Sequence, residues 1–439
     1  DSNGNKISCE ETSVTSTEYQ CNLQRVEYSG AATVTVKIDD IPSNNITFAN
    51  IQPALKKNTA TKVSAASETG FTVQGWALGD LKVNDKVALN DTDTVFTCTV
   101  TQITPDTTPS SPTDPTHSFY CKLDNGAVVS ASLMASVTIG GLTSDVVEVG
   151  QLQPYVNPDS VAVGSAPDTV FNITGYGLKN IKGAQMTVSY TPSAGSPKDT
   201  SVNITCTEYE EEINVLSCSW TDGLKHPGKA AVVVTGFNNE QSASTVVAHI
   251  IPVITKNATN FDYCVEGNQL TITGYGFCDI PEADVELNWQ SSTINCTSPT
   301  LTSDPTCIIT CTPAGISGGG ALTTKIRVSN GANDSFESTY EQVASIVPCV
   351  DTVQDVSVTS LPHTITLDVL GLEGPTEVEV YDAGNNYINA TASISGTTLT
   401  LQITKYPVVP GYAKVIIANT TLSPIKFLPA IIESASDDT

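Results

Sequence analysis

The sequence predicts an all-β chain built as a linear series of antiparallel β-sandwich domains. Three observations lead to this fold class. A strand-like segment, residues 270–277 (LTITGYGF), recurs about once per hundred residues along the 439-residue chain. A proline follows a β-rich run once in every repeat. No stretch shows a convincing helical period, which an α/β scaffold would require several times over.

In the recurring segment apolar and polar residues alternate, as in a strand with one buried face. Leu270 and Ile272 are expected to face inward, with Thr271 and Thr273 on the opposite face. Gly-aromatic-Gly follows, where glycine permits positive φ or close backbone approach and the ring is expected to cap the core. The other copies are 71–78, 171–178 and, in decayed form, 365–372. For the aromatic residues Trp76, Tyr176 and Tyr275 we expect core packing rather than a ligand cage.

Prolines at the ends of β-rich runs mark the repeat boundaries, because proline cannot donate to a β ladder and suits a strand end or a short stiff joint. They are Pro53, Pro154, Pro252, Pro348 and Pro429. The predicted domains are a partial domain at 1–53, full domains at 54–154, 155–252 and 253–348, and a divergent domain at 349–439. The last is expected to be cysteine-free, with Cys349 counted to the third full repeat. The partial domain has only the second half of a repeat. Linkers this short predict neighbouring domains in fixed relation.

The charge balance excludes several partners. Twenty Lys and Arg against 46 Asp and Glu give a net charge of −26, which argues against nucleic acid and against docking on an anionic membrane. A self-repelling, soluble surface is indicated. No run of about 18 apolar residues could span a bilayer. The chain has neither a signal peptide nor an initiator Met, so we expect a processed protein or a fragment of a longer one.

Twelve cysteines, mostly one pair per repeat, predict disulfides in an oxidising compartment. There is no CxxC and no histidine at zinc spacing, so no metal site is expected. The predicted hairpin pairs are Cys9–Cys21, Cys98–Cys121, Cys206–Cys218 and Cys296–Cys311. The remaining four, which we expect to pair among themselves in one of three connectivities, are Cys264, Cys278, Cys307 and Cys349.

Nine Asn-x-Ser/Thr sequons also indicate an extracellular or secretory location. In 171–173, 202–204 and 294–296 the asparagine lies between two inward-pointing residues, so its side chain is expected on the solvent face. The predicted N-glycosylation sites, whose occupancy the sequence leaves open, are Asn45, Asn90, Asn172, Asn203, Asn257, Asn295, Asn333, Asn389 and Asn419. Residues 104–117 are rich in Pro, Ser and Thr and predict an extended loop that could carry O-glycans.

No pattern in the chain predicts catalysis or a cofactor. The four histidines, which lack a His or Cys partner at ligand spacing, are His117, His226, His249 and His363. We place the first two in Pro-rich loops, the third in a closing strand and the fourth beside Pro362. Residues 315–319 fit G-x-S-x-G, but no helix follows, so a hairpin turn is favoured.

Two acidic stretches could offer oxygen ligands to Ca²⁺. They are the glutamates at 208 and 210–212, and residues 90–93. Neither has EF-hand spacing, so Ca²⁺ is unsupported and a solvated charged surface is favoured.

Residues 272–277, Cys296, the Cys311-Thr-Pro313 segment and the Gly-rich turn before a Val-containing strand resemble the immunoglobulin-like IPT/TIG domain. The resemblance is good at 253–348, fair at 155–252, weak at 54–154 and limited to strand order at 349–439. Domains of this family occur in plexins, in growth-factor receptors and in many secreted or surface proteins. The resemblance implies a sandwich that mediates contacts and carries no chemistry.

Three functions fit these features. The first is an extracellular glycosylated structural protein, a subunit of a fibre, coat or adhesive assembly, with the half-repeat completed either by upstream sequence or head-to-tail by strands of a neighbouring copy. The second is the ligand-binding or adhesion ectodomain of a membrane-anchored receptor. The third is a non-catalytic part of a secreted enzyme. The sequence favours the first and leaves the ligand and the organism open.

Overall fold

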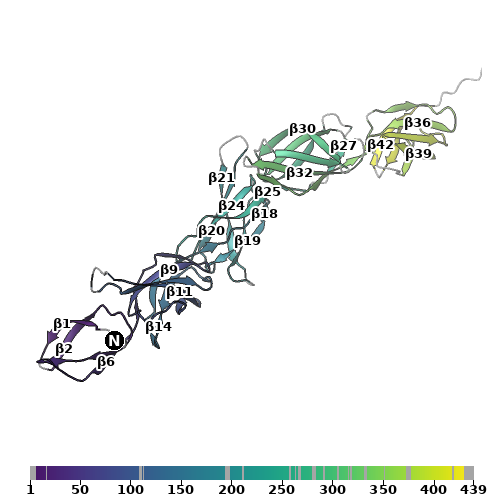
Figure 1. Ribbon diagram of the computed structural model, residues 1–439. Coiled ribbons are helices and arrows are strands. Elements are labelled where there is room, and N and C mark those ends of the chain that lie inside the picture. The colour runs from purple at the N-terminus through teal and green to yellow at the C-terminus, as the bar shows by residue number, and fades with distance from the viewer. Residues whose placement is uncertain are drawn as a thin grey trace, which may run out of the picture.

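The structure is a computed structural model, and all secondary structure that it describes is β-strand. Domains follow one another end to end in an elongated array, with the half-repeat at one end and the last domain at the other (Figure 1). The predicted fold class is confirmed. The described residues are 6–15, 17–107, 111, 113–192, 198–209, 212–256, 259–262, 264, 268–278, 283–289, 292–303, 306–314, 316, 319–330, 334–350, 352–371, 377–417 and 420–429. The predicted ranges serve below as domain names: the half-repeat (1–53) and the first to fourth domains.

The half-repeat consists of antiparallel hairpins. β1 pairs with β2, β3 with β6 and β4 with β5, in three separate two-stranded sheets. The bounds are β1 Ser8–Val14, β2 Tyr19–Gln24, β3 Gly30–Val34, β4 Lys37–Ile38, β5 Ile41–Pro42 and β6 Ile46–Ile51.

The first domain forms one path of eight hydrogen-bonded strands, β7-β9-β12-β11-β10-β13-β16-β8, that encloses its own core. A small hairpin, β14–β15, projects from it. The bounds are β7 Ala54–Leu55, β8 Lys62–Ser64, β9 Gly70–Trp76, β10 Lys86–Asn90, β11 Val95–Pro105, β12 His117–Leu123, β13 Ser132–Ser136, β14 Thr138–Ile139, β15 Leu142–Thr143 and β16 Val147–Gln153.

In the second domain the same path is divided into two sheets, β17-β19-β23-β22 and β18-β25-β24-β20-β21, which pack around a separate core. The bounds are β17 Tyr155–Val156, β18 Val161–Gly164, β19 Val170–Tyr176, β20 Gly183–Tyr190, β21 Lys198–Asn203, β22 Thr205–Glu208, β23 Val215–Ser219, β24 Gly228–Thr235 and β25 Thr245–Ile251.

The third domain repeats the continuous path, β26-β28-β31-β30-β29-β32-β34-β27, with β33 paired to β32. The bounds are β26 Val253–Ile254, β27 Thr259–Asp262, β28 Leu270–Tyr275, β29 Ala283–Trp289, β30 Ser292–Ser303, β31 Cys307–Ala314, β32 Gly320–Asn330, β33 Asp334–Glu337 and β34 Glu341–Val347.

The fourth domain again has two sheets, β35-β42-β41-β37-β38 and β36-β40-β39. The bounds are β35 Gln354–Val356, β36 His363–Asp368, β37 Val378–Tyr381, β38 Tyr387–Ile388, β39 Ala390–Ser395, β40 Thr398–Ile403, β41 Gly411–Ile417 and β42 Thr420–Phe427.

The recurring segments form β9, β19, β28 and β36, and alternation sets their inner face as expected. Leu270 and Ile272 are buried, and the next core residue, Phe277, is fully buried. Each complete domain also has one parallel pair, in which a short early strand lies beside the closing strand: β8–β16, β18–β25, β27–β34 and β35–β42. By order and pairing, β1, β2, β3 and β6 match β11, β12, β13 and β16 of the first domain. The half-repeat therefore has the second half of a domain.

Candidate functional site

The joints between successive domains are the most regular feature of the molecule. At the joint of the second and third domains, the N–H of Gly276 donates to the carbonyl oxygen of Leu224 at 2.7 Å, and the N–H of Cys278 donates to that of Lys225 at 2.9 Å. Two other joints repeat this pair of hydrogen bonds. They are Gly177 to Ala127 (2.7 Å) with Lys179 to Val128 (3.1 Å), and Ala77 to Val26 (2.9 Å) with Gly79 to Glu27 (2.8 Å).

The first donor of each pair lies in the left-handed region of φ, directly after the recurring strand. Gly177 and Gly276 have φ of 69° and 78°, and Ala77 has 54°. This conformation turns the chain so that its N–H faces the preceding domain. A Cβ on Gly276 would lie 2.5 Å from Ser165 Oγ, so the close approach also excludes a side chain there.

At two of these joints the aromatic residue before the donor contacts the preceding domain. A Cβ on Gly126 would lie 1.9 Å from Tyr176 Cδ1, and one on Gly223 would lie 2.0 Å from Tyr275 Cδ1. Trp76 differs, because its Nε1 donates to the carbonyl oxygen of Asp114, in a loop of its own domain, at 2.9 Å. Tyr176 packs against a core, as expected, but it is the core of the preceding domain. Each aromatic residue is the last of its strand, and the rings of Tyr176 and Tyr275 fill the joint beside a glycine of the neighbouring loop.

Side chains strengthen the joint between the first and second domains. Asn238 Nδ2 donates to the carbonyl oxygen of Leu152 at 3.0 Å, and Ser130 Oγ donates to that of Gly177 at 2.5 Å. Two ion pairs cross the same joint, Lys62–Glu240 and Lys179–Asp93, each at 2.8 Å. The hydrogen bond from Lys62 lowers the pKa of Glu240, and the hydrogen bond to Asp93 raises the pKa of Lys179. Because these pairs are exposed, solvent screens them and each contributes little to the stability of the joint.

A buried aspartate holds the loop that receives the second domain. Asp91, after β10, is 2% exposed, and its carboxylate accepts hydrogen bonds from the backbone N–H of Asp93, Thr94 and Val129. Val129 follows the two acceptor carbonyls directly. The stretch 90–93, weighed as a possible cation site and favoured as a solvated surface, is therefore a turn that orders the joint loop.

The fourth domain repeats this device with Asp382, also 2% exposed. Its carboxylate accepts from Gly384 and Asn386 in the turn, and from Val408 and Val409 at 2.9 and 3.0 Å. Burial by itself would raise the pKa of Asp382, but these hydrogen bonds outweigh burial and lower the pKa to about 2.

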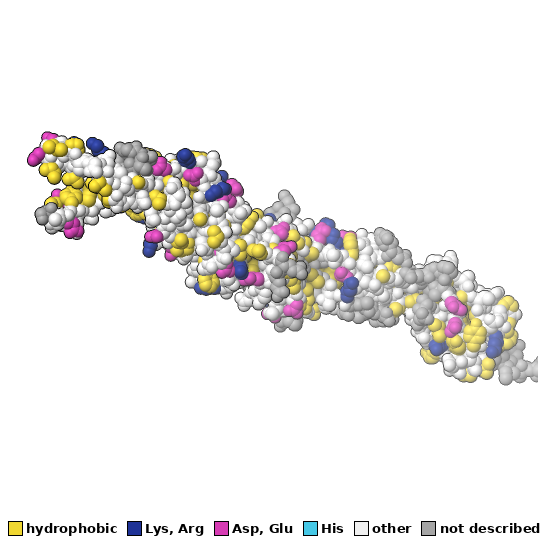
Figure 2. Space-filling view, turned by 90° about the horizontal axis from the view of Figure 1, so that it is seen from below, with side chains coloured by type: hydrophobic (Ala, Val, Ile, Leu, Met, Phe, Trp, Pro, Cys, Tyr) yellow, Lys and Arg dark blue, Asp and Glu magenta, His cyan; other side chains and the backbone are white. Residues whose placement is uncertain are grey.

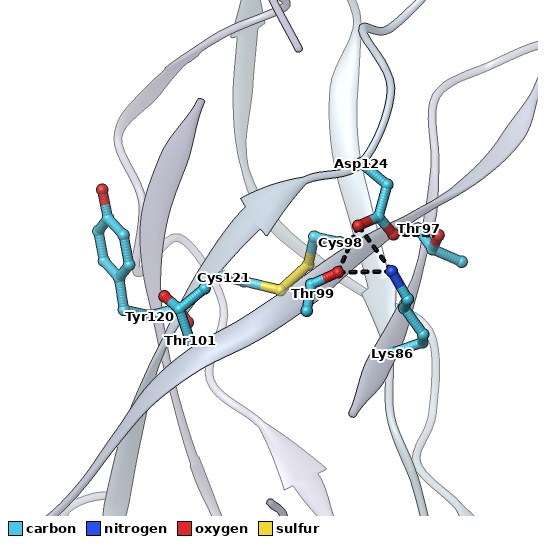
Figure 3. Close-up of a disulfide and its surroundings, with 8 residues drawn as sticks. All are labelled: Lys86, Thr97, Cys98, Thr99, Thr101, Tyr120, Cys121 and Asp124. Carbon is cyan, nitrogen blue, oxygen red and sulfur yellow. Dashed lines mark hydrogen bonds and ion pairs between the residues drawn. A yellow bond between two sulfur atoms is a disulfide. The ribbon is translucent and has the colours of Figure 1, made fainter. Parts of the chain in front are cut away.

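The β11–β12 hairpin precedes the loop that carries Ala127 and Val128, and two contacts hold this hairpin together. Cys98 and Cys121 form a disulfide between β11 and β12, and Lys86 reaches over the same hairpin to Asp124, with Nζ–Oδ1 at 2.8 Å (Figure 3). Burial opposes ionisation of Asp124, but hydrogen bonds from Lys86, Thr97 and Thr99 outweigh it and lower its pKa. Since Asp124 follows β12 directly, the joint loop starts from an anchored position.

All twelve cysteines are in disulfides. The four hairpin pairs form as expected from spacing, and the other four cysteines form Cys264–Cys349 and Cys278–Cys307. Cys349 also exchanges both backbone hydrogen bonds with Leu370, at the start of the fourth domain. The joint of the third and fourth domains thus has a covalent tie, and the expectation of a cysteine-free range 349–439 was wrong at its first residue.

The sequon asparagines that lie in the described residues are all exposed. They are Asn45, Asn90, Asn172, Asn203, Asn295 and Asn389. In β19 the neighbours of Asn172, Phe171 and Ile173, are buried, so the asparagine points away from the core. Asn257, Asn333 and Asn419 lie outside the described residues.

The histidines take structural positions. His117 is the first residue of β12 and is buried, so its placement in a loop was wrong; burial lowers its pKa, and Glu27 partly offsets this. His226 stacks on Tyr190, and His249 contacts Phe336 edge-on across a joint. His363 begins β36.

The loop 104–117 differs from the expected extended loop. Pro115, Thr116 and His117 are buried, and Thr116 Oγ1 donates to the carbonyl oxygen of Val26 at 3.0 Å. This end of the loop packs into the joint between the half-repeat and the first domain, although its composition suggested that it would not pack.

The remaining sites considered in the sequence are only partly described. Glu208 accepts a hydrogen bond from the N–H of Asn180, and 210–211 lie outside the described residues, as do Gly315, Ser317 and Gly318 of the G-x-S-x-G stretch. The described residues contain no cluster of His, Cys, Asp and Glu that could hold a metal ion. Nor is any helix in the described part of the chain capable of spanning a bilayer.

No family model matches the chain, and no curated protein matches it. Solved structures of tandem domains are similar to it at low identity. A three-domain segment of titin, I67–I69, is 12% identical, covering 63% of this chain and 99% of that one, with a TM-score of 0.21. A tetra-tandem repeat from the extending region of a large adhesion protein is 13% identical, covering 85% and 97%, with a TM-score of 0.20. At these values the fold assignment rests on the strand topology described above.

Proposed function

We propose that the chain is an extracellular, N-glycosylated structural or adhesive protein that acts as a stiff spacer in a fibre or surface layer. Its domains are proposed to be of the IPT/TIG type. The observation that carries the proposal is the joint, since the same two backbone hydrogen bonds recur at three successive joints. A chain of independently moving binding modules does not need such joints, because flexible linkers suffice.

Other features support an extracellular role. Six disulfides in one chain are typical of oxidising compartments. The six described sequon asparagines are exposed and accessible to glycosylation. The net charge of −26 keeps such rods apart except where specific contacts form.

The half-repeat is proposed to be the point of assembly, completed head-to-tail by strands of a neighbouring chain. Such heterologous contacts propagate into filaments unless they close into rings. Negative-stain microscopy of native material tests the proposal directly. Filaments or regular layers are expected, whereas lone rods at high concentration with no self-association would contradict it and favour the receptor alternative.

Small-angle scattering of the isolated chain tests stiffness separately. A stiff array gives a distance distribution with a long, reproducible maximum dimension, independent of salt. A broad distribution that indicates free domain reorientation would contradict the role of a spacer.

A further inference from the structure

The half-repeat exposes side chains that the first domain buries at matching positions. Tyr19 of β2 is 58% exposed, whereas Phe119 of β12 is 1% exposed. Phe48 of β6 is 54% exposed, against 0% for Val149 of β16. Hydrophobic side chains gather on the two lobes at this end of the molecule, on either side of a notch (Figure 2). The half-repeat therefore has the inner faces of a sandwich without the strands that cover them.

The first domain shows which strands cover those faces. β12 pairs with β9 on the side away from β11, and β10 lies between β11 and β13. Within the described residues, β2 pairs only with β1, and no strand joins β1 to β3. Of the strands that the half-repeat lacks, two would cover these faces, one antiparallel beside β2 and one between β1 and β3.

Three complete domains agree on the register of the strand beside β2. An apolar residue of the recurring strand lies opposite the second cysteine of the hairpin in each, and the pairs are Phe71–Cys121, Phe171–Cys218 and Leu270–Cys311. The apolar residue two positions later lies opposite Phe119, Leu216 and Ile309 respectively. Cys21 and Tyr19 occupy these two positions in the half-repeat. A strand with two alternate apolar residues before Gly-aromatic fits this edge.

A cavity of about 570 Å³ lies at the same edge, and residues of β2 and Trp76 of the first domain line it. The loop after β2 is already fixed to the first domain through the carbonyl oxygens of Val26 and Glu27. The edge is therefore held in place without the completing strands. Such preorganisation lowers the ordering cost when strands of another chain bind to it.

We propose that the free edge of β2 and the exposed inner faces of the half-repeat bind the first half of a repeat of this same type, carried by a neighbouring chain. The bound segment corresponds to β9 and β10, with its first apolar residue opposite Cys21 and its second opposite Tyr19. Binding is by β-strand addition, in which backbone hydrogen bonds give affinity and alternate side chains give specificity. This inference rests on the proposed head-to-tail assembly and names the segment that makes it.

The test uses the full chain and a fluorescent peptide of residues 168–190, which contains β19 and β20. Saturable binding is expected, with slowed amide hydrogen exchange at 19–24 and none of this slowing in β16. A Phe171→Asp/Ile173→Asp peptide is expected to bind at least about tenfold more weakly, because both side chains face the core. The matched control, Asn172→Asp/Thr174→Asp, puts the same charge on the exposed face and is expected to bind within about threefold of the original.

Failure of the peptide to bind, equal weakening by both variants, or protection elsewhere in the chain would overturn the inference. Failure of the wider proposal looks different. Filaments in native material together with a non-binding peptide would mean that assembly uses another contact. If the peptide binds but native material never assembles, the strand-binding site is supported and the proposed role as a structural subunit is contradicted.

Discussion

Gly276 donates its backbone N–H to the carbonyl oxygen of Leu224 at 2.7 Å, which joins the third domain to the second. The two residues are in different domains and come from a strand end and a loop. The geometry depends on the positive φ of Gly276, and at this joint Ser165 leaves no space for a side chain, whereas Ala77 has the same sign of φ with its methyl group at the joint of the half-repeat and the first domain. The same relation recurs at two other joints, where Gly177 and Ala77 are the donors.

Gly276→Ala is expected to weaken the joint of the second and third domains. The left-handed backbone costs an alanine about 1–2 kcal/mol, and its Cβ would also lie 2.5 Å from Ser165 Oγ. Scattering should show a broader distribution of domain orientations, and thermal unfolding should begin earlier. Gly183→Ala is the matched control, because no atom lies within 4 Å of its added Cβ. If the two variants behaved alike, the orientation of the second and third domains would not depend on Gly276.

Asp382 is expected to make the fourth domain sensitive to acid. Its pKa is lowered to about 2 in the folded state, below its ordinary value of 3.8. Its contribution, about 2 kcal/mol, is therefore fully present above about pH 4 and is lost as the pH falls through 2.

The measurement is the unfolding free energy of the native chain and of Asp382→Asn across that range. The two should differ at pH 6 and converge towards pH 2. Asp368→Asn, an exposed position in the same domain, is the control and should follow the native curve. If the difference in unfolding free energy between the two proteins did not change with pH, the substitution would act through packing rather than through the charge of Asp382.

Local alternation was enough to predict the strands, because it reports which face of one strand is buried. Leu270 and Ile272 are an example: their spacing alone places them in a core. Cysteine spacing was similarly informative where a hairpin closes a short loop, as between Cys206 and Cys218. The pairing of Cys264 with Cys349 was not, since a separation of 85 residues depends on how a whole domain folds.

The joints could not be predicted from alternation, because their partners come from different domains. Tyr275 looks like a core residue in its own strand, and its contact with Gly223 appears only when two domains are placed together. A signal was nevertheless present. Gly126 and Gly223 each lie shortly before a strand of one domain, and the next domain carries the aromatic residue that needs the space.

The composition of loop 104–117 was misleading for a related reason. Proline, serine and threonine disfavour a core within one domain, but the end of this loop packs between two domains, where Thr116 reaches Val26. The carboxylate of Asp91 was missed because sequence does not distinguish an exposed acidic turn from one that caps a neighbouring loop.

Removal of the Cys264–Cys349 disulfide is expected to cost more stability than removal of Cys206–Cys218. The two close loops of 85 and 12 residues, and chain entropy assigns them about 4.5 and about 3 kcal/mol. The measurement is denaturant unfolding of the two Cys→Ser double variants. Scattering should also show increased freedom between the third and fourth domains only for the first. The reverse order of stability would mean that strain or unfolded-state structure dominates.

N-glycosylation is expected at Asn172, on the exposed face of β19, and at Asn203, at the end of β21. Mass measurement of native material before and after enzymatic deglycosylation should locate glycans on both, and Asn84, exposed but outside any sequon, should carry none. Since β19 presents an outward face between buried residues, a glycan there should also keep sheet faces of neighbouring rods apart. Asn172→Gln is then expected to increase lateral association in light scattering without changing the unfolding midpoint. Unmodified asparagines at both positions would contradict the proposed extracellular location, because both residues are exposed and lie in sequons.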